Sequence, residues 1–351
     1  GVAVEDLEVR DGYVFAVKHL AGQEVEALLP GLLQDILTSL NFPKTMRWAD
    51  YDFRFVRPIR WMVVAFVDDV ILIDITGVNS GKLSRGHRFL RPALVEEAKA
   101  IESLDDAKEL LEKAVSAVKN TVTSAINKTA GVVEIPCAEA YEQVLMDNFV
   151  MVDQDARREL IRQQVIDLAV EEGGHAEIDE DLLEEVNYLV EWPTALCGKF
   201  EDKFLALPKE CIITPMREHQ RYFPVLKEDG SLLNKFITVR NGGKEHLEVV
   251  AHGNERVLRA RLADAEFFFN EDRKQPLEAR LAKLTTVSFQ EGLGNMNDKS
   301  QRLVKAADMI AFGLNSKVDK EKLARTALLC KTDLVTGMVV EFTELQGVMG
   351  R

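Results

Sequence analysis

Two apolar runs separated by a pair of aspartates constrain the fold of this chain more than any other feature. The runs are Trp61–Val67 and Val70–Ile75, and Asp68 and Asp69 lie between them. Each run has the length of a β-strand, and a short polar connection between two such runs is typical of a hairpin turn. We therefore predict an antiparallel pair of strands here, at the centre of a sheet.

Helical periodicity dominates the rest of the chain. Apolar residues recur at three- and four-residue steps over 28–40, 157–169, 182–190 and 254–270, and helical patterns continue from Gly294 to the end. Tyr13–Val17 reads as a strand, and Asp229-Gly230 marks a second hairpin before a strand at Phe236–Val239. A length of 351 residues suits two or three domains. The predicted fold class is α+β and multidomain, passing into an all-helical C-terminal part.

Composition narrows the functional classes. The chain is 46% hydrophobic and 29% charged, which is typical of a soluble globular protein, and no apolar run reaches the length of a membrane span. Glu5 and Asp6 argue against a signal peptide, and both ends have the character of internal cuts. Four scattered cysteines predict reduced thiols in a cytosolic protein, without a disulfide framework or a zinc ribbon. A net charge of −14 argues against a protein that coats nucleic acid over its whole surface, but it does not exclude local basic patches.

Basic and aromatic residues alternate in three places. RNA recognition uses guanidinium groups for phosphates and flat rings for unstacked bases. The alternative is that the arginines pair with the many acidic residues while the rings pack in a core. A helical spacing of three also puts Arg256 and Arg259 on one face of a predicted helix. The predicted RNA-binding candidates are Arg47, Arg57, Arg60, Arg85, His87, Arg88, Arg217, His219, Arg221, Tyr222, Arg256 and Arg259.

Signatures of catalysis are missing from the sequence. There is no phosphate loop of the G-x-x-x-x-G-K-[ST] type and no nucleophile elbow of the G-x-S-x-G type. His219 has an adjacent acid, Glu218, but no nucleophile or second acid is identified with it, so a structural or RNA-stacking histidine is favoured over a general base. We predict no catalytic residue and no metal ligand in this chain.

Four motif blocks in a fixed order resemble the beta subunit family of bacterial tetrameric glycyl-tRNA synthetase. They span the chain from Phe42 to Gly350, so the resemblance covers nearly all of it. The blocks are FPKTMRW at 42–48 with FVRPIRW at 55–61, SRGHRF at 84–89, MREHQRYF at 216–223 with GNERVLRARLADA at 253–265, and KTDLVT at 331–336 with EFTELQGVMG at 341–350.

The resemblance implies a domain order. Residues 1–200 would form an N-terminal mixed-sheet domain of the B3/B4 type, with a helical insertion at about 93–131 to which no function is assigned. Residues 201–290 would form an α+β region similar to the body and tail of archaeal CCA-adding enzymes, which grip tRNA. This resemblance makes Arg256 and Arg259 the preferred phosphate contacts. Residues 291–351 would be the truncated start of an all-helical HD-like domain. Whether an editing pocket persists in the first domain is left open.

The resemblance also implies a role. The chain would be a tRNA-binding, non-catalytic subunit of glycine-tRNA ligase in the cytoplasm, binding no cofactor itself. Its partners would be glycine tRNA and the alpha subunit, in an α2β2 assembly in which the alpha subunit uses ATP and Mg²⁺. One alternative is a metal-dependent phosphohydrolase of the HD type, although the position of its His-Asp pair reads Thr332-Asp333 and no histidine follows His252. The other is a purely structural linker.

Overall fold

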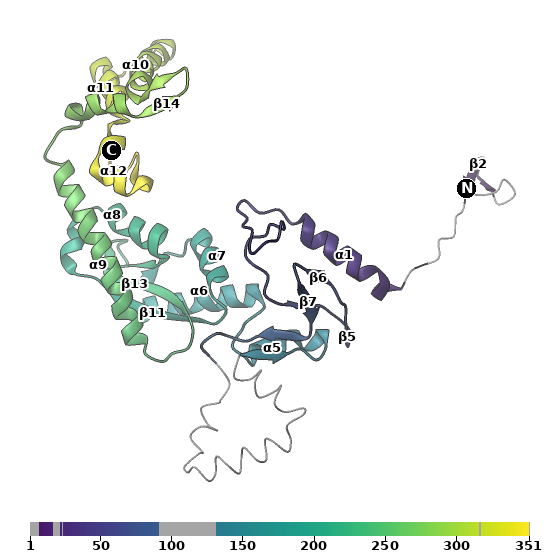
Figure 1. The fold of residues 1–351 in the computed structure, drawn as a ribbon. Coiled ribbons are helices and arrows are strands. Elements are labelled where there is room, and N and C mark those ends of the chain that lie inside the picture. Colours follow the sequence, from purple (N-terminus) through teal and green to yellow (C-terminus); the bar gives the residue numbers. More distant parts are fainter. Residues whose placement is uncertain (1–6, 17–21, 23, 91–130, 316, 351) are drawn as a thin grey trace, which may run out of the picture. The chain divides into compact units, whose positions relative to one another are not determined.

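The computed structural model describes residues 7–16, 22, 24–90, 131–315 and 317–350 (Figure 1). The chain divides into two compact units, Gly1–Val150 and Met151–Arg351. Helices and several small sheets occur together, which confirms the predicted α+β class. The predicted insertion at about 93–131 lies almost wholly outside the described residues. The family-type domains at 1–200, 201–290 and 291–351 stay predictions.

The first unit begins with the predicted strand and helix. Strand β1 (Leu7–Arg10) pairs with β2 (Tyr13–Ala16) across a turn at Asp11 and Gly12. Helix α1 (Val25–Ser39) then follows the predicted apolar repeat.

The predicted hairpin is present, but its strands are much shorter than the two apolar runs. Strand β4 (Ala65–Phe66) pairs antiparallel with β5 (Asp69–Val70). Val67 adopts a left-handed conformation, with φ of 54°, so the turn begins one residue before the predicted aspartates. Thr76 adopts the same conformation and ends the second run. The prediction of two continuous strands at the centre of a sheet is therefore wrong.

Small sheets replace that single sheet, and four isoleucines of this region are buried. The first has three strands, in the order β3 (Met62–Val63), β7 (Val78–Gly81) and β6 (Asp74–Ile75). A two-stranded sheet joins β8 (Leu83–Arg85) to β9 (Val132–Glu134), and β9 leads through η2 (Ala138–Ala140) into α5 (Tyr141–Met146). Ile71, Ile73, Ile75 and Ile135 are buried in this part of the unit, and Ile75 belongs to β6 itself.

A four-stranded antiparallel sheet forms the centre of the second unit. In order across the sheet, its strands are β10 (His175–Ala176), β12 (Phe223–Leu226), β13 (Leu232–Asn241) and β11 (Pro193–Lys199). The connection between β12 and β13 contains the predicted Asp-Gly turn, so this hairpin is confirmed.

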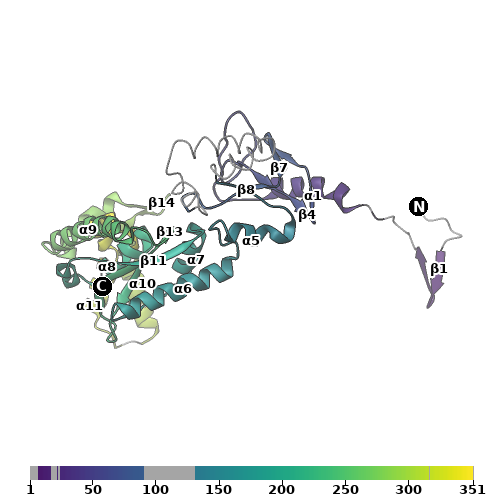
Figure 2. The same ribbon diagram turned by 90° about the horizontal axis from the view of Figure 1, so that it is seen from below.

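Helices cover both faces of this sheet (Figures 1 and 2). Phe223, Val225 and Ile237 pack against α6 (Gln154–Glu171) and α7 (Glu180–Leu189). On the other face, Phe236 packs with residues of η3 (Asp202–Ala206), α8 (Lys209–Thr214) and α9 (Leu247–Asp272). The alternation of side chains along β13 gives each helical layer its own apolar surface.

The C-terminal part is helical, as predicted, apart from one small hairpin. Strands β14 (Ser288–Gln290) and β15 (Gly294–Asn295) pair after η5 (Leu277–Thr286). Asn295 and Asp298 then form a capping box that starts the next helix, and a side chain at Gly294, where φ is 80°, would collide with the Asp298 carboxylate. The remaining elements are α10 (Met296–Gly313), α11 (Lys320–Leu329), η6 (Thr332–Val335), α12 (Gly337–Glu341) and η7 (Thr343–Leu345). Within the described ranges, no helix is both long and apolar enough to cross a membrane.

Candidate nucleic-acid interface

The segment between α1 and β3, residues 41–60, concentrates positive charge in an acidic chain. It contains five basic and two acidic residues, a net charge of +3. We call this segment the arginine loop. Met46 and Phe55 exchange two backbone hydrogen bonds across it, with N···O distances of 2.9 and 3.2 Å. The loop therefore has a defined conformation, although it contains no regular helix or strand.

Aromatic rings inside the arginine loop pack against one another. The rings of Phe42 and Phe55 meet edge to face with centroids 4.9 Å apart, and Phe53 stacks on Phe55 at 5.9 Å. Trp48 meets Phe53 edge to face at 5.9 Å. These rings form the loop's own small core, as the alternative interpretation predicted for them.

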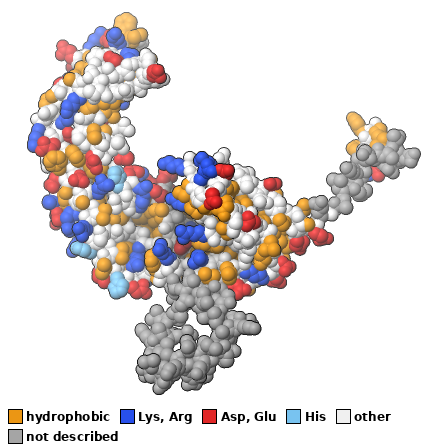
Figure 3. Space-filling view, in the orientation of Figure 1, with side chains coloured by type: hydrophobic (Ala, Val, Ile, Leu, Met, Phe, Trp, Pro, Cys, Tyr) orange, Lys and Arg blue, Asp and Glu red, His pale blue; other side chains and the backbone are white. Residues whose placement is uncertain are grey.

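The arginines of the loop point outward. Arg54, Arg57 and Arg60 are exposed, and no carboxylate of the described residues lies within 4.0 Å of their guanidinium groups. Arg57 donates only to the neighbouring carbonyl of Val56, at 3.2 Å. Arg47 is exposed too, but it forms an ion pair with Asp52. Figure 3 shows Lys and Arg side chains gathered over this loop.

A second basic group lies on and after β8. The guanidinium carbon of Arg85 lies 5.3 Å from the centroid of the Trp61 ring, and that of Arg88 lies 5.4 Å from Phe89. Both arginines are exposed, and so are both rings. Since Trp61 directly follows Arg60, Arg85 continues the positive surface of the arginine loop.

His87 lies inside the first unit and not on this surface. Its side chain is 1% exposed, and Nδ1 accepts hydrogen bonds from the backbone N–H groups of Phe89 and Leu90 at 3.2 and 3.0 Å. Its own backbone N–H donates to Asn148. The histidine therefore fixes the turn that presents Arg88, and a stacking contact with a base would require it to leave the core.

The arginines of the third block are engaged in ion pairs. Arg217 lies 2.6 Å from Asp179, and Arg221 lies 2.6 Å from Glu185. His219 approaches Glu344 at 3.7 Å and packs beside the ring of Phe342. These contacts join the π-helical turn η4 (Pro215–Gln220) and the residue after it to Asp179 at the start of α7, to Glu185 within α7 and to Glu344 in η7. An RNA phosphate would have to compete with these carboxylates.

Tyr222 belongs to the core of the second unit. Its ring stacks on Phe236 at a centroid distance of 4.5 Å, and its hydroxyl lies 3.1 Å from Oδ1 of Asn254. Burial raises the pKa of Tyr222 to about 12. The position next to Phe223 in an apolar strand pattern was the available signal that this ring packs inward.

The two preferred arginines on α9 differ. Arg259 is paired with Glu201 at 3.2 Å, whereas Arg256 is exposed and has no carboxylate within 4.0 Å among the described residues. Of these two arginines, Arg256 is the one whose charge is not paired within the described part of the chain.

Asp333, the residue that would anchor a metal in the rival hypothesis, has a structural role. It is 2% exposed, and its carboxylate accepts the backbone N–H of Gly347. The hydroxyl of the preceding Thr332 donates to the carbonyl of Leu329 at 2.7 Å. In the part of the chain that the structure describes, no group of three or more His, Cys, Asp or Glu side chains is arranged to hold a metal ion. No observation favours the phosphohydrolase alternative, and the expectation of a metal-free chain stays a prediction.

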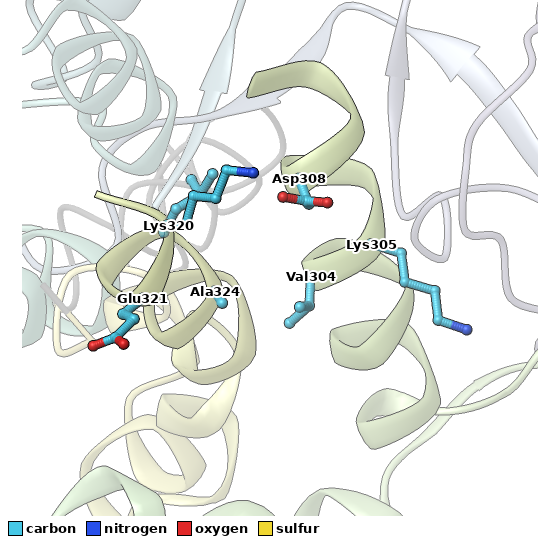
Figure 4. Close-up of a pocket in the computed structure, with 7 residues that line it drawn as sticks. Val304, Lys305, Asp308, Lys320, Glu321 and Ala324 are labelled. Atoms are coloured by element: carbon cyan, nitrogen blue, oxygen red, sulfur yellow. The ribbon is translucent and has the colours of Figure 1, made fainter. Parts of the chain in front are cut away.

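A cavity of about 400 Å³ lies between α10 and α11 (Figure 4). Figure 4 shows Lys320 and Asp308 reaching toward each other, while Lys305 and Glu321 point away. Two basic and two acidic residues give this lining no net charge, so it has no preference for RNA.

Comparisons with known proteins agree over the full length of the chain. The family described as glycyl-tRNA synthetase beta subunit matches residues 1–130 and 107–351. The glycine–tRNA ligase beta subunit of Moorella thermoacetica is 45% identical over 100% of this chain and 46% of its own length. That of Bacillus subtilis is 43% identical, also over 100% and 46%, and that of Clostridioides difficile is 44% identical over 97% and 44%. The chain thus spans about half the length of these curated relatives, and it belongs to the glycyl-tRNA synthetase beta subunit family.

Proposed function

We propose that this chain is a tRNA-binding part of glycine–tRNA ligase that carries no aminoacylation chemistry of its own. The observation that carries the proposal is the arginine loop of a chain with net charge −14: Arg54, Arg57 and Arg60 are exposed there and have no carboxylate partner in the part of the chain that the structure describes. Unpaired arginines are available to neutralise phosphates, and this neutralisation dominates the affinity of proteins for nucleic acid. The relatives are named as beta subunits of the same ligase, which supports glycine tRNA as the RNA.

We rank the candidates by the ion pairs that each would have to break on binding RNA. Arg57, Arg60, Arg88 and Arg256 are exposed and have no carboxylate partner among the described residues, so they lead the proposal, with Arg54 beside them. Arg85 joins them because its guanidinium lies over the exposed Trp61 ring. Arg47, Arg217, His219, Arg221 and Arg259 would each have to give up a carboxylate. His87 and Tyr222 are buried, so we assign them a role in holding the fold and not in contacting RNA.

The proposed contribution to catalysis is positioning. The chain would hold glycine tRNA so that its acceptor end reaches the alpha subunit, which lowers the entropic cost of bringing the acceptor and the activated amino acid together. ATP and Mg²⁺ would be used by that partner, in an α2β2 assembly in the cytoplasm.

The test is binding of glycine tRNA to the chain over a series of salt concentrations. In the variant with Arg54→Gln, Arg57→Gln and Arg60→Gln, affinity falls and the plot of log K against log salt becomes shallower. The slope is about 0.9 per phosphate contact on a helical stem, so loss of all three contacts lowers its magnitude by about 2 to 3.

A control variant with the same change in net charge comes from arginines in ion pairs. It combines Arg158→Gln, Arg162→Gln and Arg325→Gln, whose partners are Glu184, Glu180 and Glu278. Its slope stays at the wild-type value. Equal slopes for both variants would remove the arginine loop from the interface. Failure of the wild-type chain to bind at any salt concentration would leave only the linker role.

A further inference from the structure

A separate cavity of about 350 Å³ lies in the first unit, beside Trp61. Its volume is at the lower end of small-molecule sites in proteins, which are usually of about 300–1,000 Å³. The lining residues come from the position before β3, from β3 and β4, from β8, and from the segment between the end of β9 and the start of α5. They are Trp61, Val63, Ala65, Ser84, Ile135, Ala138 and Tyr141.

The walls of the cavity combine apolar surface with two accessible rings. Val63, Ala65 and Ile135 supply the apolar part, and Ile135 is fully buried. Trp61 and Tyr141 remain 44% and 38% exposed although both line the cavity. Both rings are therefore accessible to a ligand, whereas the rings of the arginine loop pack against one another.

One polar side chain lies inside this lining. Ser84 is 6% exposed, because the alternation along β8 turns it inward while Leu83 and Arg85 face outward. Within the described ranges, no hydrogen bond is made by the Ser84 hydroxyl. The Ser84 oxygen is not among the fully enclosed unpartnered atoms of the described residues, so it is accessible from the cavity, where a ligand can bond it as donor or acceptor.

Positive charge borders the opening. The Arg85 guanidinium lies over the Trp61 ring, and Arg60, which has no carboxylate partner among the described residues, precedes this ring in sequence. A ligand in the cavity would thus be flat and apolar on its faces, polar at one edge and joined to an anionic group outside. An unstacked base of an RNA, with its phosphate, has this combination of properties.

We propose that the cavity binds one unstacked nucleobase of the RNA, stacked on Trp61 and hydrogen-bonded to Ser84. This inference rests on the proposed tRNA-binding function and adds to it a second kind of contact, since the arginine loop would hold phosphates and the cavity would hold a base.

Tryptophan fluorescence tests the contact directly. The chain has three tryptophans, so Trp48→Phe with Trp192→Phe leaves Trp61 as the sole emitter. The probes are a single-stranded tetraribonucleotide and an abasic ribose-phosphate chain of the same length. The base-bearing probe quenches Trp61 saturably, and the abasic probe does not. Equal quenching by both probes would overturn the inference.

Affinity measurements on otherwise wild-type protein complete the test. Trp61→Leu weakens binding of the tetraribonucleotide about 5- to 150-fold, the range for loss of one stacked base. The matched control is Tyr13→Ala, which removes a ring of the same unit that is 72% exposed and lies outside the cavity. If Trp61→Leu fails to fold, Ser84→Ala provides the second measurement, and it weakens the base-bearing probe more than the abasic one.

The outcomes separate this inference from the proposed function. Normal binding of glycine tRNA, together with Trp61 fluorescence that the base-bearing probe does not quench, would overturn the base site and leave the proposed function standing. Base-dependent quenching without any binding of glycine tRNA would support the site and remove the function. A free nucleoside monophosphate that binds as tightly as the tetraribonucleotide would identify a nucleotide site and overturn the RNA assignment.

Discussion

Replacing Gly198 with alanine should destabilise the second unit, because no space exists there for a methyl group. Gly198 lies on β11 directly opposite Phe236 of β13. A Cβ at this position would lie 2.9 and 3.0 Å from Cε1 and Cε2 of that ring, and closer still to Cζ. The ring is fully buried and stacks on Tyr222 behind it, so it has little room to move.

The magnitude follows from the overpacking. Forcing a methyl group into a packed core costs about 1–3 kcal/mol. For a unit of about 200 residues, a loss of ~2 kcal/mol lowers the melting temperature by about 4–8 °C. Thermal unfolding followed by circular dichroism measures this shift.

The same substitution elsewhere provides the control. Gly253 lies inside α9, and an added Cβ there meets nothing within 4 Å. Gly253→Ala should raise stability by about 0.5–1 kcal/mol, since alanine is the better helix former. A Gly198→Ala protein that melts at or above the wild-type temperature would refute the reasoning, and with it the assignment of Tyr222 to a rigid core.

Two further predictions concern residues that support the fold. Asp272 accepts the backbone N–H groups of Gly337 and Met338 at 2.9 and 2.8 Å and pairs with the buried Arg280 at 3.0 Å. Asp272→Ala should therefore lower the free energy of unfolding by about 2–4 kcal/mol, measured by thermal unfolding. The control Glu278→Ala breaks an exposed pair with Arg325 and should leave the melting temperature unchanged. Burial raises the pKa of Tyr222 from 10 to about 12, so the folded state holds the phenolic proton more tightly than the unfolded state does. The stability that this difference contributes is fully present below pH 10 and is lost as the pH rises to 12. Urea unfolding at pH 9 and pH 11.5 should show a larger loss for the wild type than for Tyr222→Phe, and equal losses would contradict the shifted pKa.

The types of the elements could be read from the sequence, because they depend on local periodicity. The repeat of Leu28, Leu32 and Ile36 predicted α1, and the Asp-Gly turn predicted the hairpin of β12 and β13. The division of residues 61–81 into short strands could not be read in this way. It depends on the left-handed conformations of Val67 and Thr76, which such β-branched residues rarely adopt.

The sequence was enough to locate the candidate site, but not to decide which arginines are available to bind RNA. Clusters of arginine mark the arginine loop in the sequence itself. Whether an arginine is free depends on partners far away in the chain, such as Asp179 for Arg217 and Glu185 for Arg221. Burial of His87 also depends on tertiary structure, since its neighbours Arg85 and Arg88 are exposed.

The aromatic packing inside the arginine loop has a consequence for the rate and energy of association. Since Phe42, Phe53 and Phe55 already fix the backbone, an approaching RNA does not have to order it. The entropic penalty that remains is the loss of rotamer freedom of a few arginine side chains, about 0.5–1.5 kcal/mol for each one immobilised. A preorganised loop of this kind favours docking in a single step, without a folding transition coupled to binding.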